Sequence, residues 1–257
     1  GKITMQINKH GSFYIRNGWP TKIIDAMDIQ GRSSYIFSPN NELSAVDQIG
    51  IGRVMVKALR YWAAVLGITV ETKTQQGVLH TLTGFGEMIA QYDSYSQRAG
   101  TLWFLHRNLS RSIEEATAWS WAFNMYTAKS STKDEFVSAF YAFVQTSGGK
   151  YAKSAIEKEF DCFKNTYVSD KAFDLDKILE EDTIPFFAPR GCWSMSAVGV
   201  LKRDAFQQKI FPYMYSFTAS SRTTRRTYRP MCRSALIRCL KKWTRWGNIW
   251  ILAIQLC

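Results

Sequence analysis

The chain has 257 residues, 46% of them hydrophobic, which is enough for a sizeable core, and its formal net charge is +12. It contains no P-loop, GxGxxG, GxSxG or CxxC motif and only three scattered histidines, so nucleotide hydrolysis, serine-hydrolase chemistry and zinc binding have no support. There is no apolar leader and no stretch long enough to span a bilayer, and Cys162 is the one cysteine of the first 189 residues, so we expect a cytoplasmic protein with no membrane partner.

The first recognisable segment, residues 10–22 (HGSFYIRNGWPTK), is compact, aromatic and basic. Three of its apolar side chains are predicted to pack on the domain that follows: Phe13, Ile15 and Trp19. Two of its cations, Arg16 and Lys22, could contact DNA phosphates or could simply be solvated, and the sequence does not separate these alternatives. Residues 30–42 are rich in Gly, Ser, Pro and Asn and are predicted to form a loop.

Residues 45–84 have the pattern of a winged helix-turn-helix, with two helices around a glycine turn and then a two-stranded hairpin. Gly50 and Gly52 are predicted to supply the positive φ and the close approach that the turn between the helices needs. The second helix, which Gly67 is expected to end, has a predicted buried stripe. The stripe is formed by Val54, Ala58, Tyr61, Trp62 and Val65.

Three cations, Arg53, Lys57 and Arg60, recur along the second helix at helical spacing, which places them on one face away from the buried stripe. A basic face on the second helix is what insertion into the DNA major groove requires. Ordinary solvated cations are the alternative. We favour DNA contact because the turn and the hairpin accompany these residues.

After the hairpin the sequence predicts a helix over residues 83–93 and a strongly helical stretch over residues 100–124. Thr132–Glu135 and Ser154–Glu157 are predicted capping boxes of two further helices, both rich in aromatic residues. We therefore predict a mainly α fold. A winged helix-turn-helix domain over residues 1–98 precedes an aromatic-rich helical bundle over residues 99–189.

The last segment, residues 190–257, differs sharply in composition from the rest of the chain. It holds 13 basic residues and one acidic residue, whereas the first 189 residues hold 20 of each and are neutral. It also holds four of the five cysteines and four of the nine tryptophans. A basic tail that binds DNA or a membrane surface is one interpretation.

We favour a shifted reading frame that begins near residue 190. Synonymous codons for residues 234–250 exist in which an adjacent frame gives apolar residues at helical spacing, balanced charge and no Cys or Trp. The segment is therefore predicted to be non-native, so the net charge of +12 is no evidence for nucleic-acid binding.

Six stretches resemble, in this order, the SspB family: FYIRNGWPTK, IGIGRVMVKALRYW, GTLWFLHRNL, ATAWSWAFN, EKEFDCFKNTYV and EEDTIPFFAP. SspB is the DNA-nicking component of a bacterial system that places phosphorothioate in the DNA backbone as part of phage defence. The resemblance covers about residues 10–189. It implies a cytoplasmic protein that binds double-stranded DNA and nicks one strand, beside a cysteine desulfurase, an ATPase and an ATP-pyrophosphatase.

The resemblance supplies no defined catalytic set, so the candidates follow from the chemistry of phosphodiester cleavage. A divalent metal, Mg²⁺ or Mn²⁺, held by carboxylates commonly activates the water and stabilises the developing charge. We predict Glu159, Glu181 and Asp182 as metal ligands, and Glu159, His106 and Asp161 as catalytic residues.

Each candidate has a structural alternative. Glu159 could face a cleft or solvent, and its position on the helix favours solvent. Glu181 and Asp182 belong to an acidic run that more commonly forms a solvated helix end. His106 could act as a general base with Arg107 as phosphate clamp, although a buried core histidine is favoured.

Two functions of different classes therefore stand side by side. The first is a metal-dependent DNA nickase. The second is a non-catalytic DNA-binding adaptor or regulator, in which the helical bundle binds partner proteins or forms a homodimer. Metal-dependent strand scission separates the two.

Overall fold

The computed structural model describes residues 4–28, 31–168, 186–187, 193–196 and 198–203. These residues belong to one compact unit that spans Gly1–Asp204. Helices predominate in the described part, so the predicted mainly α class is confirmed. None of the described helices is long and apolar enough to cross a membrane.

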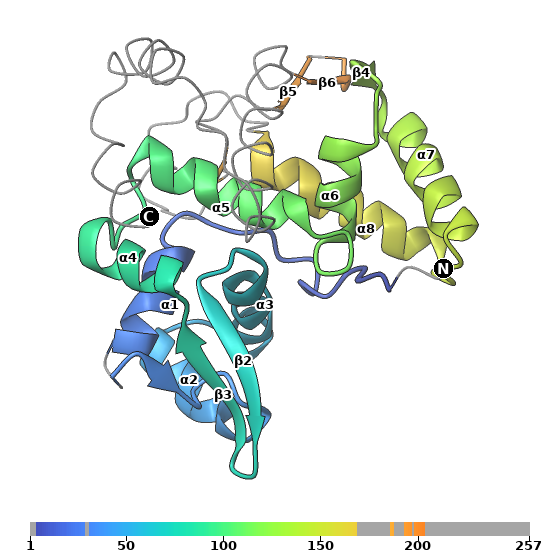
Figure 1. Cartoon of the computed structure of the whole chain (residues 1–257). Coiled ribbons are helices and arrows are strands. Elements are labelled where there is room, and N and C mark those ends of the chain that lie inside the picture. Colours follow the sequence, from blue (N-terminus) through green and yellow to red (C-terminus); the bar gives the residue numbers. More distant parts are fainter. Residues whose placement is uncertain (1–3, 29–30, 169–185, 188–192, 197, 204–257) are drawn as a thin grey trace, which may run out of the picture. The chain divides into compact units, whose positions relative to one another are not determined.

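The first half of this unit combines four helices with a small antiparallel sheet (Figure 1). Its elements in chain order are α1 (Trp19–Asp28), β1 (Ser33–Ser34), the 3-10 helix η1 (Pro39–Asn41), α2 (Glu42–Ile49), α3 (Arg53–Val65), β2 (Thr69–Thr74), β3 (Gly77–Leu82) and α4 (Gly84–Tyr92). The sheet order is β1-β3-β2. The segment predicted as a loop over residues 30–42 thus contains β1, which pairs with β3 through Ser33–Thr81 and Ser34–His80.

A tight turn joins α2 to α3, as predicted. Gly50 adopts a φ of +71°, and its N–H donates to the Val46 carbonyl, which ends α2. The prediction for Gly52 is wrong, because its φ is −62° and a Cβ there would meet nothing within 4 Å. Gly52 is instead the extended residue that precedes α3.

The buried face of α3 largely follows the predicted stripe, since Ala58, Trp62 and Val65 are buried. Val54 departs from it with 56% exposure, because the buried face begins at Val56 and includes Leu59. The N-terminal segment covers this face, and the Trp62 indole N–H donates to the Phe13 carbonyl at 3.0 Å. The predicted packing of the first segment on this half is therefore confirmed.

Helix α4 follows β3, and its first turn packs closely against the start of β2. Thr83 caps α4, since its hydroxyl donates to the Gly67 carbonyl at 2.6 Å and accepts from the Gly86 N–H at 2.9 Å. A side chain at Gly86 would overlap the Ile68 carbonyl oxygen. This close approach fixes α4 against the start of the hairpin.

The second half is an aromatic helical bundle capped by a second small sheet (Figure 1). Its elements are α5 (Ala99–Arg111), α6 (Thr117–Asn124), β4 (Ser130–Ser131), α7 (Lys133–Thr146), α8 (Lys153–Tyr167), β5 (Trp193–Met195) and β6 (Leu201–Arg203). The sheet order is β4-β6-β5. The two halves share one continuous apolar core.

Two local predictions for the bundle need correction. The helix expected over residues 100–124 breaks between α5 and α6, and the Asn124 amide donates to the Ser110 carbonyl that the break leaves open. The capping box at Thr132–Glu135 is confirmed. The one at Ser154–Glu157 is wrong, because α8 already starts at Lys153 and its cap residue, Ala152, has no side-chain bond.

Part of the segment beyond residue 189 packs on the bundle. Trp193 and Leu201 are buried, and β6 pairs with β4 through Ser130–Lys202 and Ser131–Leu201. The Arg203 guanidinium donates to the Ala122 carbonyl and to the Tyr126 carbonyl, the latter at 2.6 Å, and lies over the Trp193 ring. The non-native origin of residues 190–257 stays a prediction, and residues 204–257 lie outside the described part.

Candidate nucleic-acid interface

The exposed side of α3 carries the predicted basic face. The side chains of Arg53 and Lys57 are 66% and 65% exposed, and that of Arg60 is partly covered. Next to this helix, β2 turns five of its six residues outward and meets β3 at the exposed hairpin tip of Gln75 and Gln76. The helix and the hairpin therefore present polar and basic side chains together.

Two carboxylates that the sequence analysis did not consider neutralise much of this face. Glu42, at the start of α2, accepts from the Arg53 guanidinium and lies 2.9 Å from the Lys57 ammonium. Glu71, on β2, accepts two bonds from Arg60, at 2.8 and 2.6 Å. The three basic side chains are thus paired with two carboxylates, and the cluster has a net charge of +1.

These pairs shift the titration of the groups that form them. The hydrogen bond from Lys57, reinforced by Arg53, lowers the pKa of Glu42. The hydrogen bond from Arg60 lowers the pKa of Glu71, and the same bond raises the pKa of Arg60. The carboxylates are therefore ionised at neutral pH, and any polyanion that binds here must compete with them.

The two cations predicted in the N-terminal segment have structural roles. The Lys22 ammonium donates to the Ile49 carbonyl at 3.2 Å, at the end of α2. The Arg16 guanidinium lies 5.8 Å from the Tyr14 ring centre and 5.9 Å from that of Trp19. DNA contact by Arg16 and Lys22 stays a prediction.

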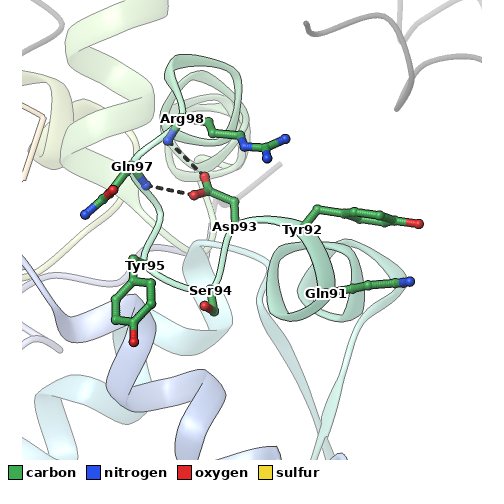
Figure 2. Close-up of a pocket in the computed structure, with 7 residues that line it drawn as sticks. All are labelled: Gln91, Tyr92, Asp93, Ser94, Tyr95, Gln97 and Arg98. Carbon is green, nitrogen blue, oxygen red and sulfur yellow. Dashed lines mark hydrogen bonds between the residues drawn. The ribbon is translucent and has the colours of Figure 1, made fainter.

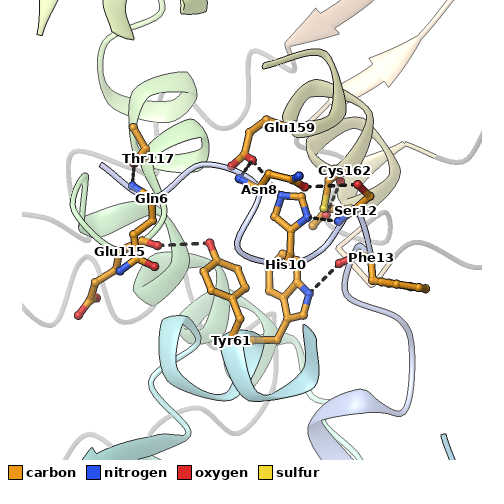
Figure 3. Close-up of polar contacts among 12 residues, drawn as sticks. Gln6, Asn8, His10, Ser12, Phe13, Tyr61, Glu115, Thr117, Glu159 and Cys162 are labelled. Atoms are coloured by element: carbon orange, nitrogen blue, oxygen red, sulfur yellow. Dashed lines mark hydrogen bonds and ion pairs between the residues drawn. The ribbon is translucent and has the colours of Figure 1, made fainter. Parts of the chain in front are cut away.

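Glu159 lies inside the protein and not at its surface, which corrects the sequence-based preference for solvent (Figure 3). One oxygen, Oε2, accepts from the Asn8 N–H at 2.6 Å and from His10 Nε2 at 3.0 Å. The other ring nitrogen of His10 accepts from the Ser12 N–H at 3.1 Å, so Nε2 carries the proton. Among the described residues Oε1 has no hydrogen-bond partner.

This buried pair joins the N-terminal segment to the bundle. His10 also lies against the rings of Tyr61 and Trp62 from α3 and of Trp119 from α6. Burial, with a smaller contribution from the Glu159 charge, raises the pKa of Tyr61 and of Cys162 well above their ordinary values. The geometry is that of a connection between the two halves of the unit.

The other two catalytic candidates lie in different environments. Asp161 is half-exposed and forms an ion pair with the Lys133 ammonium at 2.8 Å. His106 is buried on α5, and its Nδ1 shares a 2.9 Å hydrogen bond with the Tyr167 hydroxyl. The preferred interpretation of His106 as a core histidine is confirmed, and a catalytic role for either residue stays a prediction.

In the described part of the chain, no three His, Cys, Asp or Glu side chains lie close enough together to hold a metal ion. Glu159 is enclosed and bonded to His10, and Asp161 is paired with Lys133. Glu181 and Asp182 lie outside the described residues.

Two buried histidines make the stability of the protein sensitive to acid. Burial lowers the pKa of His106 to about 3. Burial also lowers the pKa of His80 to about 4, although the Glu71 carboxylate, 3.7 Å away, opposes this shift. Both residues are therefore neutral in the folded protein at neutral pH.

We expect the free energy of unfolding to fall as the pH is lowered below 6.5. Because the unfolded chain binds these protons first, each histidine should contribute a loss of about 2 kcal/mol between pH 6.5 and about pH 5. Urea unfolding at a series of pH values measures this loss. His106→Gln should make the dependence shallower, and an unchanged slope in that variant would contradict the assignment.

A family model described as "Protein of unknown function (DUF4007)" matches residues 7–189. The chain belongs to this family. The match of this DUF4007 protein ends at the residue where the composition of the sequence changes. No curated protein matches the chain.

Two solved structures are similar to this DUF4007 protein. A magnesium ion-bound SspB crystal structure has a TM-score of 0.65, and a second SspB crystal structure has a TM-score of 0.63; both are 22% identical in sequence. Each covers 77% of this chain, which in turn spans about 60% of the length of SspB. The resemblance to SspB is thus confirmed at the level of the fold.

Proposed function

We propose that this DUF4007 protein binds duplex DNA as a winged helix-turn-helix protein, with α3 in the major groove and the β2–β3 hairpin as the wing. One observation carries the proposal. The order α2, glycine turn, α3 and hairpin occurs in one compact unit and leaves Arg53 and Lys57 about two-thirds exposed on the face that would meet DNA.

Binding would exchange carboxylate partners for phosphates. Arg53 and Lys57 can leave Glu42, and Arg60 can leave Glu71, because both carboxylates lie at the edge of the same face. Each exchange releases a counterion from DNA but leaves a carboxylate without its partner. The two glutamates therefore weaken sequence-independent attraction and favour sites where the base contacts offset their loss.

Glu42→Gln is expected to tighten binding to duplex DNA of arbitrary sequence, because Arg53 and Lys57 then face phosphate without competition. The affinity should rise at each salt concentration, whereas the slope of log K against log salt should stay close to that of wild type, because the same phosphates are contacted in both complexes. Fluorescence anisotropy of a labelled duplex at several salt concentrations measures both the affinity and the slope.

The matched control for this variant is Glu87→Gln. Glu87 lies on α4, which is neither α3 nor part of the hairpin, and forms an exposed ion pair with Arg32 at 3.5 Å. Equal affinities for wild type and both variants would contradict a role of Glu42 in DNA binding.

We further propose that the protein works in a bacterial DNA phosphorothioate modification system and nicks one strand there, as the resemblance to SspB implies. A cysteine desulfurase, an ATPase and an ATP-pyrophosphatase would be its partners. One of the similar SspB structures is bound to magnesium. In this chain Glu159 is bonded to His10 and Asp161 is paired with Lys133. The proposed Mg²⁺ or Mn²⁺ site therefore rests first on Glu181 and Asp182, and Glu159 stays a proposed ligand.

Relaxation of supercoiled plasmid by the full chain, with Mg²⁺ or Mn²⁺ and with EDTA as control, tests the nicking step. We expect open-circle product that depends on the metal and that the double variant Glu181→Gln, Asp182→Asn fails to make. Glu87→Gln, at an exposed carboxylate outside the proposed site, is the control that should stay active. Duplex binding without any scission would instead support the adaptor alternative.

A further inference from the structure

The connection between α4 and α5 forms a surface that the α3 interface does not use. An open depression of about 340 Å³ lies over residues 91–95, 97 and 98 (Figure 2). Gln91, Tyr92 and Arg98 extend to the same side of this connection, and we call these three residues the α4–α5 platform. Together they present an amide, an aromatic ring and a guanidinium group.

The backbone beneath the platform is firmly braced. The Asp93 carboxylate accepts from the Gln97 and Arg98 N–H groups, both at 3.0 Å, and the Thr21 hydroxyl donates to the Ser94 carbonyl at 3.0 Å. Ser96 is only 4% exposed and has a φ of +51°. This backbone conformation is energetically unfavourable for a residue that has a side chain. Such a loop holds its exposed side chains in place before a ligand arrives.

The electrostatics of the platform favour an anion beside an aromatic ring. The Asp93 carboxylate is bonded to backbone N–H groups at the start of α5, and no described carboxylate forms an ion pair with the Arg98 guanidinium. Tyr92 is 42% exposed, although aromatic rings of this size are usually more covered. A cation and an open ring therefore face the same depression.

These three groups correspond to the three parts of a nucleotide. A guanidinium group binds phosphate, an aromatic ring stacks on the face of a base, and an amide forms hydrogen bonds with the edge of a base. The face of a base is accessible only when it is out of the duplex stack. The platform thus fits an unpaired nucleotide better than a duplex.

We infer that the α4–α5 platform binds an unpaired nucleotide of a single DNA strand, with Tyr92 against the base and Arg98 on the phosphate. The inference rests on the proposed DNA-binding function and adds a second, strand-selective contact to it. A protein with both surfaces would hold a duplex through α3 and a locally unpaired strand through the platform.

Anisotropy titrations of the full chain with a labelled oligothymidylate of about 15 nucleotides and with a labelled duplex test the inference. Tyr92→Leu should weaken binding to the single strand at least about fivefold, and Arg98→Gln should make its salt slope shallower by about 0.7. Neither change should alter duplex affinity. Phe104→Leu, with 41% exposure on α5, and Arg111→Gln, exposed at the other end of α5, are the matched controls.

The outcomes separate this inference from the proposed function. Duplex binding without single-strand binding, or single-strand affinity that Tyr92→Leu leaves unchanged, overturns the platform and leaves the duplex interface standing. Absence of binding to either DNA overturns both. Loss of single-strand binding in Phe104→Leu to the same degree as in Tyr92→Leu would also overturn the assignment, because it would trace the effect to α5 packing.

Discussion

A chain that ends at Pro189 is expected to have a free energy of unfolding at least about 5 kcal/mol below that of a chain that ends at Asp204. The shorter chain loses Trp193 and Leu201, both buried, and substitutions that empty sites of this size each cost about 2–5 kcal/mol. It also loses the Arg203 guanidinium, which bonds the Ala122 and Tyr126 carbonyls. A loss of this size is a third or more of the free energy of unfolding of an ordinary protein, which is about 5–15 kcal/mol.

Urea unfolding of both truncated chains and of the full chain measures this difference. The chain that ends at Asp204 is the reference, because the compact unit ends there. A milder variant, Leu201→Ala in the full chain, should cost about 2–5 kcal/mol and keeps the test readable if the shorter chain cannot be purified. Equal stability of the two truncated chains would mean that β5 and β6 add nothing to the bundle.

This result also bears on the predicted shift of reading frame. A native frame through Arg203 would explain why these residues pack and form hydrogen bonds, and the change in frame would then lie further along the chain. Sequencing the source gene tests this directly. An uninterrupted frame shared with close relatives would contradict the prediction of a non-native segment.

The second large effect is expected at Glu159. Replacement by alanine removes the buried acceptor of the Asn8 N–H and of His10 Nε2. It should lower the free energy of unfolding by about 2–6 kcal/mol, about 1–3 kcal/mol for each donor left without an acceptor. The N-terminal segment should loosen from α8 at the same time. Glu159 is thus expected to act on structure, whatever its part in chemistry.

Urea unfolding of Glu159→Ala beside Asp161→Ala provides the measurement and its control. Asp161 lies on the same helix, but its ion pair with Lys133 is half-exposed, and such pairs contribute about 1 kcal/mol or less. A Glu159→Ala variant as stable as wild type would contradict the buried pair. Loss of plasmid nicking in this variant is evidence for catalysis only if the variant is folded.

Much of the first half of the fold could be predicted because its signals are local. The glycine turn, the periodicity of α3 and the hairpin all lie within a stretch of 40 residues, 45–84, where neighbouring positions determine the structure. Gly50 illustrates this, since its +71° φ follows directly from the need to end one helix and begin the next. The capping box at Thr132 is a local signal of the same kind.

The partners of the candidate residues could not be predicted, because they belong to other helices, strands or segments of the chain. Glu42 precedes Arg53 by 11 residues, Glu71 follows Arg60 by 11, and His10 is 149 residues from Glu159. Helical spacing identified the cations but contains no information on carboxylates from other elements. The preference for an exposed Glu159 failed for the same reason, since the N-terminal segment covers that side of α8.

The salt dependence of duplex DNA binding tests the central claim most directly. Wild type and the triple variant Arg53→Gln, Lys57→Gln, Arg60→Gln would be compared by anisotropy over a range of salt concentrations. If each cation meets a phosphate, the slope of log K against log salt should be shallower in the variant by about 2.7. An unchanged slope in a folded variant would contradict DNA binding through α3.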